Sequence, residues 1–313
     1  MVEDDIARDY RVFGREARGR SQVYEEISAH VPGDPGLREF LTALPRPKQQ
    51  PNLLYGAVQY LYGPIRDWPS FRETVLGHED EVRAVMMRRR TQTNEAARCA
   101  LLLPALAALP EPLALIEVGA SAGLCLLPDR YGYDYPGGRI AGSPMLSCRA
   151  NAATPVPDRV PEIIWRAGLD LNPLDITDES DCAWLHALIW PGEEYRHDIL
   201  RQALDIARQD PPRVVRGDLR TDLATLAAEA PSDATLVVFH TAVLAYLHDD
   251  EPGREAFAEA VASTGAVWLA NESPRVIPGV EAPGPRPEMA PLLVQDGRPL
   301  AWTDGHGTWI EWL

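Results

Sequence analysis

The first third of the chain carries apolar residues at the spacing of amphipathic helices. Between residues 4 and 109 they recur every three or four positions with charged residues between them, most clearly in the run from Ile6 to Ile27. Pro32-Gly33 ends that run. Further helices are expected over 51–62, 71–87 and 93–109. Because Pro-Glu-Pro at 110–112 breaks the pattern, we expect an all-helical N-terminal domain over residues 1–110.

From residue 113 the pattern changes to short apolar runs. Those that read as buried strands lie at 113–118, 163–168, 213–215, 235–239 and 266–270. Helical patterns separate most of them, at 178–187, 194–209, 219–229 and 251–263. Such alternation is typical of a parallel sheet covered by helices. Asp-Gly turns then separate short strands over 292–295, 298–303 and 308–312, which predicts a C-terminal antiparallel hairpin region. We therefore expect an α/β domain over residues 111–313.

Two irregular stretches interrupt this second domain. Residues 131–162 contain a Gly-Gly pair, several prolines and the closely spaced Tyr131, Tyr133 and Tyr135. We interpret them as an insertion between the first two strands. Residues 274–291 form a second long loop, rich in proline, near the edge of the sheet.

The composition is that of an ordinary soluble globular protein. Of 313 residues, 45% are hydrophobic and 24% are charged, and the net charge is −16, which disfavours nucleic acid and anionic membranes as partners. Lys48 is the only lysine, and it stands in Arg-Pro-Lys-Gln-Gln. This context has neither the Gly-Lys-Ser/Thr of a phosphate-binding loop nor the buried setting of a Schiff-base lysine. Proteins with a phosphate-binding loop and Schiff-base enzymes are therefore excluded. We expect a small-molecule substrate.

The cysteines and the start of the chain point to the reducing compartment of the cell. Cys99, Cys125, Cys148 and Cys182 form no Cys-x-x-Cys pair, so we expect buried thiols and no metal site. His248-Asp-Asp-Glu251 is interpreted as the start of a helix rather than as a metal cluster. The acidic N-terminus and the lack of a run of ~20 apolar residues predict a cytoplasmic protein.

The clearest candidate site follows the first strand of the sheet, in Glu117-Val-Gly-Ala-Ser-Ala-Gly123. Gly119 permits a sharp turn, and Gly123 permits close approach of the backbone to a ligand at a helix N-terminus. The second and third glycines of the dinucleotide fingerprint are replaced by Ser121 and Leu124. What remains, acidic-x-Gly-x-x-x-Gly, resembles the first motif of S-adenosylmethionine-dependent methyltransferases, with Ser121 where that motif usually has a glycine. A tight turn that binds nothing is the alternative.

An acidic residue after the second strand is the next candidate. In Arg166-Ala-Gly-Leu-Asp170, the carboxylate of Asp170 stands where methyltransferases bind both ribose hydroxyls. It lies much farther along the chain from Glu117 than the ~20 residues expected in dinucleotide sites, so the insertion has to absorb the excess. Asp134 is the alternative ribose ligand, and a turn-forming aspartate is the structural explanation for Asp170.

Three further strand ends carry polar residues at the edge where open α/β sheets bind ligands. Asp218 follows the third strand and is placed to pair with an adenine amino group, or to cap the next helix. His240 follows the fourth strand, where a neutral imidazole can act as a general base. Asn271 and Glu272 end the fifth strand and are candidate substrate ligands.

A polar cluster also stands out in the otherwise apolar end of the helical part. Gln92, Asn94, Glu95 and Arg98 are placed to cover a cofactor or to hold a polar substrate, with Glu95 as a second candidate base. Helix capping by Thr93 is the structural alternative, although Ala96 occupies the position where a capping box has Glu.

Taken together, these motifs and the strand pattern resemble the Rossmann-like class I methyltransferases. The segments 91–95, 117–123, 165–175, 215–218 and 239–246 also resemble a bacterial family known only as a domain of unknown function, which we associate with actinobacteria. That family implies no reaction. The methyltransferase resemblance implies S-adenosylmethionine as cofactor, with Glu117 and the turn through Gly119, Ser121 and Gly123 at its methionine end.

The same resemblance assigns Asp170 to the ribose and Asp218 to the adenine. Methyl transfer is an in-line displacement, so alignment supplies most of the catalysis, and a base such as His240 or Glu95 matters only when the acceptor must lose a proton. We expect a methyltransferase acting on a small molecule. A cofactor- or nucleoside-binding protein without turnover and an interaction scaffold with a vestigial site are the alternatives.

Overall fold

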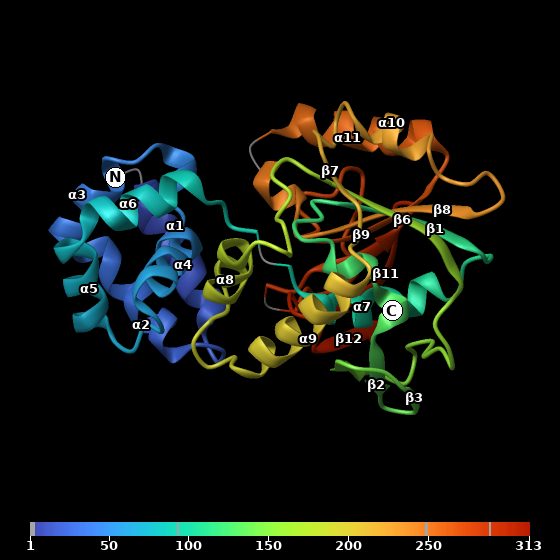
Figure 1. Cartoon of the computed structure of the whole chain (residues 1–313), viewed down its shortest axis with the longest axis horizontal. Helices are drawn as coiled ribbons and strands as arrows, with labels where there is room; N and C mark the ends of the chain where they lie inside the picture. Colours follow the sequence, from blue (N-terminus) through green and yellow to red (C-terminus); the bar gives the residue numbers. More distant parts are fainter. Residues whose placement is uncertain (1–3, 93, 248–249, 288) are drawn as a thin grey trace. The chain divides into compact units, whose positions relative to one another are not determined.

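The chain divides into two compact units that are interleaved along the sequence (Figure 1). The computed structural model describes residues 4–92, 94–247, 250–287 and 289–313. One unit consists of residues 1–93 and 177–198, and the other of residues 94–176 and 199–313. The division therefore differs from the expected boundary at residue 110. The helix that follows residue 98 belongs with the sheet, and a later segment of the chain returns to the helical unit.

The helical unit consists of amphipathic helices with side-chain caps. Its α-helices are α1 (Asp5–Ala17), α2 (Gln22–His30), α3 (Pro35–Thr42), α4 (Pro51–Tyr62), α5 (Trp68–Gly77), α6 (Glu79–Arg88) and α8 (Glu179–Ala187), with short 3-10 turns η1 (Val31–Gly33) and η2 (Arg46–Lys48). The single helix expected from Ile6 to Ile27 is two helices. Gly19 has a φ of +75°, and the Ser21 side chain accepts from the Tyr24 N–H and begins α2.

Aromatic side chains fill the core of this unit. Phe13 and Tyr24 pack on Tyr55, whose ring centroid lies 4.6 Å from that of Tyr24, and Trp190 packs on both Phe13 and Tyr24. The Tyr55 hydroxyl shares a buried hydrogen bond of 2.8 Å with Ser28. The core therefore draws on α1, α2, α4 and the residues that follow α8, which explains why the segment 177–198 belongs to this unit.

The second unit is built on a nine-stranded, mostly parallel sheet. Its strand order is β5-β12-β11-β10-β9-β8-β1-β6-β7. The parallel part contains β1 (Leu113–Val118), β6 (Ile163–Asp170), β7 (Val214–Arg216), β8 (Thr235–Thr241) and β9 (Val267–Glu272). The antiparallel part contains β10 (Leu292–Gln295), β11 (Arg298–Thr303) and β12 (Trp309–Trp312). A large parallel sheet that ends in antiparallel strands agrees with the expectation from the sequence.

The segment 131–162 forms structure of its own between β1 and β6. Its strands β2 (Gly132–Tyr135), β3 (Gly138–Ile140) and β4 (Met145–Ser147) make a separate three-stranded sheet. Its last strand, β5 (Arg149–Ala150), pairs with β12 at the edge of the large sheet. These strands account for the long separation between Glu117 and Asp170.

The sheet unit also contains helices and short 3-10 turns. They are η3 (Ala96–Arg98), α7 (Cys99–Leu106), α9 (Tyr195–Gln209), α10 (Leu223–Ala227), η6 (Leu244–Leu247) and α11 (Glu251–Thr264). The part of α9 up to Asp198 belongs to the helical unit. α10 and α11 pack side by side against β1, β6 and β8 through a core that includes Ile116, Val238 and Phe257 (Figure 1). Asp250 caps α11 by accepting from the Gly253 N–H, as expected for a helix start, whereas His248 and Asp249 lie outside the described residues.

All four cysteines are buried, as the sequence indicates. Cys99, Cys125, Cys148 and Cys182 are free thiols. Across the described ranges, no three His, Cys, Asp or Glu side chains group as metal ligands would, and no helix has the length and apolar character needed to cross a membrane.

Candidate functional site

The carboxyl ends of β1, β8 and β9 bring most of the predicted site residues together. Glu117 pairs in register with Phe239, and Thr241 with Asn271, so Glu117, Thr241 and Asn271 share one face of the sheet. His240 and Glu272 point to the opposite face, where His240 packs on Phe257 of α11 with ring centroids 5.3 Å apart. The point where the strand order reverses, between β1 and β8, therefore lies between two sets of polar side chains.

The turn after β1 needs its first glycine for two reasons. Gly119 has a φ of +70°, a conformation that favours glycine. A Cβ added there would lie 2.4 Å from Cγ2 of Val243, which follows β8. Val243 therefore occupies the space beside the turn that the sequence assigns to a ligand. Ser121 also adopts a positive φ, of 53°, at a site where methyltransferases usually have glycine.

The backbone N–H groups of this turn are bonded within the protein. The Ser121 N–H donates to the Asp170 carboxylate at 2.8 Å, and the Leu124 N–H donates to Asn94 Oδ1 at 2.9 Å. The Gly119 and Gly123 N–H groups donate to backbone carbonyls. The expectation that this turn offers free N–H groups to a ligand is therefore wrong for these positions. Asp170, not Asp134, is the acid that contacts the turn; Asp134 is exposed on β2.

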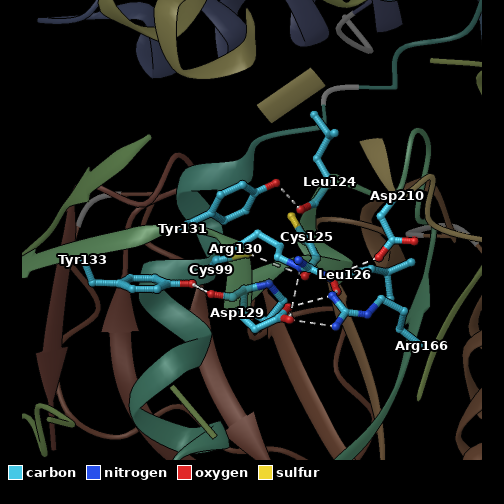
Figure 2. Close-up of polar contacts among 11 residues, drawn as sticks. Cys99, Leu124, Cys125, Leu126, Asp129, Arg130, Tyr131, Tyr133, Arg166 and Asp210 are labelled. Carbon is cyan, nitrogen blue, oxygen red and sulfur yellow. Dashed lines mark hydrogen bonds and ion pairs between the residues drawn. The ribbon is translucent and has the colours of Figure 1, made fainter. Parts of the chain in front are cut away.

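The α-helix expected after Gly123 is also absent. The chain instead forms two short 3-10 turns, η4 (Leu124–Leu126) and η5 (Pro128–Arg130). Side chains from other elements bind their carbonyls, as Figure 2 shows: Tyr131 donates to the Leu124 carbonyl at 2.8 Å, and Arg166 donates to the Leu126 carbonyl at 2.8 Å. Arg166 also forms a two-point ion pair with Asp129. A three-residue turn supplies no helix dipole comparable to that of a long helix.

The polar cluster before α7 holds this arrangement together. Arg98 donates through Nη1 to the carbonyl and hydroxyl of Thr241, at 3.2 and 3.0 Å, and through Nε to the Gly305 carbonyl at 2.8 Å. Glu95 is buried, and its side chain accepts from the Ala97 N–H at the start of η3. Glu95 thus caps the start of η3, whereas Asn94 binds the Leu124 N–H of the turn. Thr93, the cap expected from the sequence, lies outside the described residues. Gln92 belongs to the helical unit, whereas Asn94, Glu95 and Arg98 belong to the sheet unit.

Glu117 is the most unusual side chain of the site. It is 2% exposed, and its Oε2 has no hydrogen-bond partner within the described part of the chain. Burial raises the pKa of this carboxyl well above its ordinary value; the Cys125 thiol adds to the rise, and the guanidinium of Arg98 opposes it. Nη2 of Arg98 likewise makes no hydrogen bond to a described residue. A buried acid with a raised pKa and a guanidinium group with an unused N–H donor therefore lie near each other.

His240 is not available as a general base in this structure. It is fully buried, and its Nε2 accepts from the Trp268 indole N–H at 2.9 Å. Since an indole nitrogen can only donate, Nδ1 carries the imidazole proton and donates it to Glu272 Oε1 at 2.8 Å. Both ring nitrogens are thus used inside the protein. His240 therefore positions the side chain of Glu272. The structure does not support the role of general base that the sequence predicted for His240.

Two other predicted ligands are engaged by neighbouring residues. Asp218 binds the Arg220 guanidinium through both of its oxygens, at 2.9 and 2.6 Å, and the same contact lowers the pKa of Asp218. Asn271 Oδ1 accepts from the Thr303 hydroxyl at 2.7 Å. Asp218 is therefore not free to bind an adenine. Asn271 lies on the same face of the sheet as Glu117 and Thr241.

Tyr246 is a residue of this region that the sequence did not single out. It follows β8 in η6, and its side chain is 58% exposed. Its hydroxyl end is enclosed, which raises the pKa of Tyr246 to about 12, and the charges of Arg98, Glu272 and Asp170 act on the same group. A signal was present in the sequence, since an aromatic residue follows the polar end of a parallel strand.

A shallow hollow of about 240 Å³ lies elsewhere on this unit. It is lined by prolines and alanines together with Glu111, Asp158 and Arg159. Glu111 lies two residues before the start of β1, so the hollow adjoins the amino end of that strand rather than its carboxyl end. It is therefore separate from the candidate site.

Comparison with known proteins places the chain without assigning a reaction. No curated protein and no solved structure matches it. Residues 7–312, almost the whole chain, match a family described as "Uncharacterized protein conserved in bacteria (DUF2332)". This agrees with the resemblance to a bacterial family of unknown function noted from the sequence. The chain belongs to the DUF2332 family of conserved bacterial proteins.

Proposed function

We propose that this protein is an S-adenosylmethionine-dependent methyltransferase that acts on a small molecule. The proposal is carried by one observation, the unpaired and buried Oε2 of Glu117 at the carboxyl end of β1. An unsatisfied buried carboxyl group costs about 1–3 kcal/mol or more, so its retention is expected where it serves a ligand. The position agrees with the acidic residue of the methyltransferase motif.

The arrangement of the sheet supports this proposal. Numbered by their order in the chain, the parallel strands run third, second, first, fourth, fifth across the sheet, as in Rossmann-like nucleotide-binding folds. In those folds the ligand lies at the carboxyl ends, where the order reverses. Here that point lies between β1 and β8, beside Glu117 and Thr241.

The residues present fit one end of the cofactor better than the other. A protonatable acid, Glu117, and a guanidinium donor, Arg98, together match the ammonium and carboxylate of an α-amino acid. Asp170 remains the proposed ribose ligand at the end of β6, because a carboxylate oxygen can accept a hydrogen bond in addition to those from the Ser121 and Asn172 N–H groups. Asp218 is not assigned to the cofactor, because an adenine would have to displace Arg220. The N–H groups of Ser121 and Leu124 are not assigned to it either, since they donate to Asp170 and Asn94.

When bound, S-adenosylmethionine supplies a methyl group on a sulfonium, and transfer is an in-line displacement. Glu117 would bind the ammonium group and Arg98 the carboxylate, which fixes the direction of the methyl group. Burial raises the pKa of Glu117, so binding of an ammonium group would favour release of a proton from this carboxyl. Affinity is therefore expected to rise with pH until Glu117 ionises without ligand.

Calorimetry tests the proposal directly. S-adenosylmethionine and S-adenosylhomocysteine are titrated into the wild-type protein, Glu117→Gln and the control Glu162→Gln, whose side chain is exposed before β6. We expect Glu117→Gln to weaken binding about ten-fold or more, since it removes a charge-assisted hydrogen bond. Buffers of different ionisation enthalpy report the released proton. Equal affinities of Glu117→Gln and wild type would refute the assignment. Transfer of labelled methyl groups into a bacterial extract then separates an enzyme from a binding protein.

A scaffold with a closed cofactor site is the second candidate. The occupied N–H groups of Ser121 and Leu124 and the position of Val243 favour it. In that case neither adenosyl ligand produces a binding heat, and Glu117→Gln changes stability alone.

A further inference from the structure

Glu272 is the second buried acid with an unsatisfied oxygen in this region. Its side chain is fully buried at the end of β9. Oε1 accepts three hydrogen bonds, from His240 Nδ1 at 2.8 Å, from the Val243 N–H at 2.6 Å and from the Leu244 N–H at 3.1 Å. Oε2 has no partner in the described ranges of the chain. One oxygen therefore fixes the carboxyl group, and the other is left to bind something else.

No positive charge in the described structure pairs with this carboxylate. His240 contacts it through one ring N–H, and the other ring nitrogen of His240 accepts from the Trp268 indole N–H. The other two donors, Val243 and Leu244, are backbone N–H groups. A buried carboxyl oxygen without a hydrogen bond is costly, and a cationic donor supplied from outside is the kind of partner that it lacks.

The surroundings of Glu272 connect it to the surface and to Glu117. The N–H groups that Glu272 binds begin η6, the turn that carries the exposed Tyr246. Arg98 and Asp170 act on the hydroxyl of Tyr246 together with Glu272, and both also act on Glu117. Glu117 and the Tyr246 hydroxyl therefore share Arg98 and Asp170 as charged neighbours, and Glu272, on the opposite face of the sheet from Glu117, acts on the same hydroxyl. An exposed aromatic ring next to a carboxylate also suits a cation.

We propose that Glu272 Oε2 binds the nitrogen of the methyl acceptor, and that this acceptor is a small primary or secondary amine. The inference rests on the proposed methyltransferase function. The amine binds as an ammonium ion and passes one proton to Oε2. Its lone pair then forms the nitrogen–carbon bond to the methyl group as the carbon–sulfur bond breaks, and that electron pair stays on sulfur. Glu272 returns its proton to solvent when the methylated ammonium product leaves.

Substitution of Glu272 by Gln separates this role from a structural one. The amide oxygen of Gln can keep the three hydrogen bonds of Oε1, while its NH₂ group replaces the unpaired oxygen with a donor. A structural role for Oε2 predicts a less stable variant. A ligand-binding role predicts that Glu272→Gln keeps the stability of wild type, because the three hydrogen bonds that fix the side chain remain.

The experiment uses the full chain and defined probes. Ethylamine and 1,4-diaminobutane are compared with ethanol and 1,4-butanediol by saturation-transfer NMR and thermal shift, without cofactor. The variants are Glu272→Gln and the control Glu255→Gln, which is exposed on α11. We expect the amines, but not the alcohols, to bind wild type and Glu255→Gln. Glu272→Gln should lower amine affinity about ten-fold or more. Binding of amines no stronger than that of alcohols, or unchanged in Glu272→Gln, would overturn the inference.

A measurement on the wild-type protein keeps the inference testable if Glu272→Gln does not fold. The comparison of amines with alcohols needs no variant, and equal binding of the two classes contradicts the inference. S-adenosylmethionine binding, tested through Glu117→Gln, is a separate measurement: its absence with intact Glu272-dependent amine binding refutes the proposed function and leaves the amine site.

Discussion

Asp170→Ala is the variant that tests most directly how the turn after β1 is held. The carboxylate accepts from the Ser121 N–H at 2.8 Å and from the Asn172 N–H at 2.7 Å. Hydrogen bonds to a charged acceptor contribute about 1.5–3 kcal/mol each, and an orphaned buried N–H costs about 1–3 kcal/mol. These contributions overlap for Ser121, which is 3% exposed and has a positive φ. We expect a loss of about 2–4 kcal/mol in the free energy of unfolding.

The assay is urea unfolding followed by far-UV circular dichroism and tryptophan fluorescence. A thermal melt should show a decrease of roughly 5–15 °C in the transition of the sheet unit. The matched control is Asp134→Ala, whose exposed carboxylate on β2 should change stability by less than about 0.5 kcal/mol. A loss below about 1 kcal/mol in Asp170→Ala would refute the reasoning. It would mean that Asp170 is not what holds the turn, and that the turn N–H groups are available to a ligand.

Two further predictions concern the buried acid and the helical core. The pKa of Glu117 in the folded state is raised above its unfolded value of 4.5. Between these two pKa values the folded state keeps a proton that the unfolded state has lost. The free energy of unfolding should therefore decrease by about 1.4 kcal/mol per pH unit from pH 4.5 up to the raised pKa. Melting temperatures between pH 5 and 8 should fall less in Glu117→Gln than in wild type, and parallel curves would exclude a proton on Glu117. In the helical unit, Tyr55→Phe removes the 2.8 Å hydrogen bond to Ser28 and should cost about 1–2 kcal/mol in urea unfolding, whereas a neutral effect would show that Ser28 finds another partner.

The regular elements were predictable because their signals are local. The strand at Leu113–Val118 was identified with its observed bounds, as was α4, which begins at Pro51 and ends before Gly63. Proline at the first helical position and a glycine of positive φ after the last are signals that need no knowledge of the fold. The break between α1 and α2 was missed, although Gly19 and Ser21 carry the same kind of signal.

The candidate site was only partly predictable, because its contacts join distant parts of the chain. Strand ends brought Glu117, His240 and Glu272 to one edge, as the pattern indicated. Whether His240 has a free lone pair depends on Trp268, whose indole N–H no spacing rule could aim at it. The missing helix after Gly123 depends in the same way on Tyr131 and Arg166, which bind the carbonyls that a helix would have used. Sequence patterns locate such residues but do not reveal their partners.

The interleaving of the two units limits how the chain can be divided. A single cut at any position leaves one unit without a segment that it needs, since residues 177–198 belong with the first 93. During synthesis, β1 and β6 leave the ribosome before the helical unit is complete. β5 can pair with β12 only when the end of the chain has been made, as the contact between Asn151 and Trp312 illustrates. A shortened version that stopped before β12 would present β11 as an open edge, where other chains can add. Separate production of either half therefore requires a circularly permuted or rejoined gene rather than simple truncation.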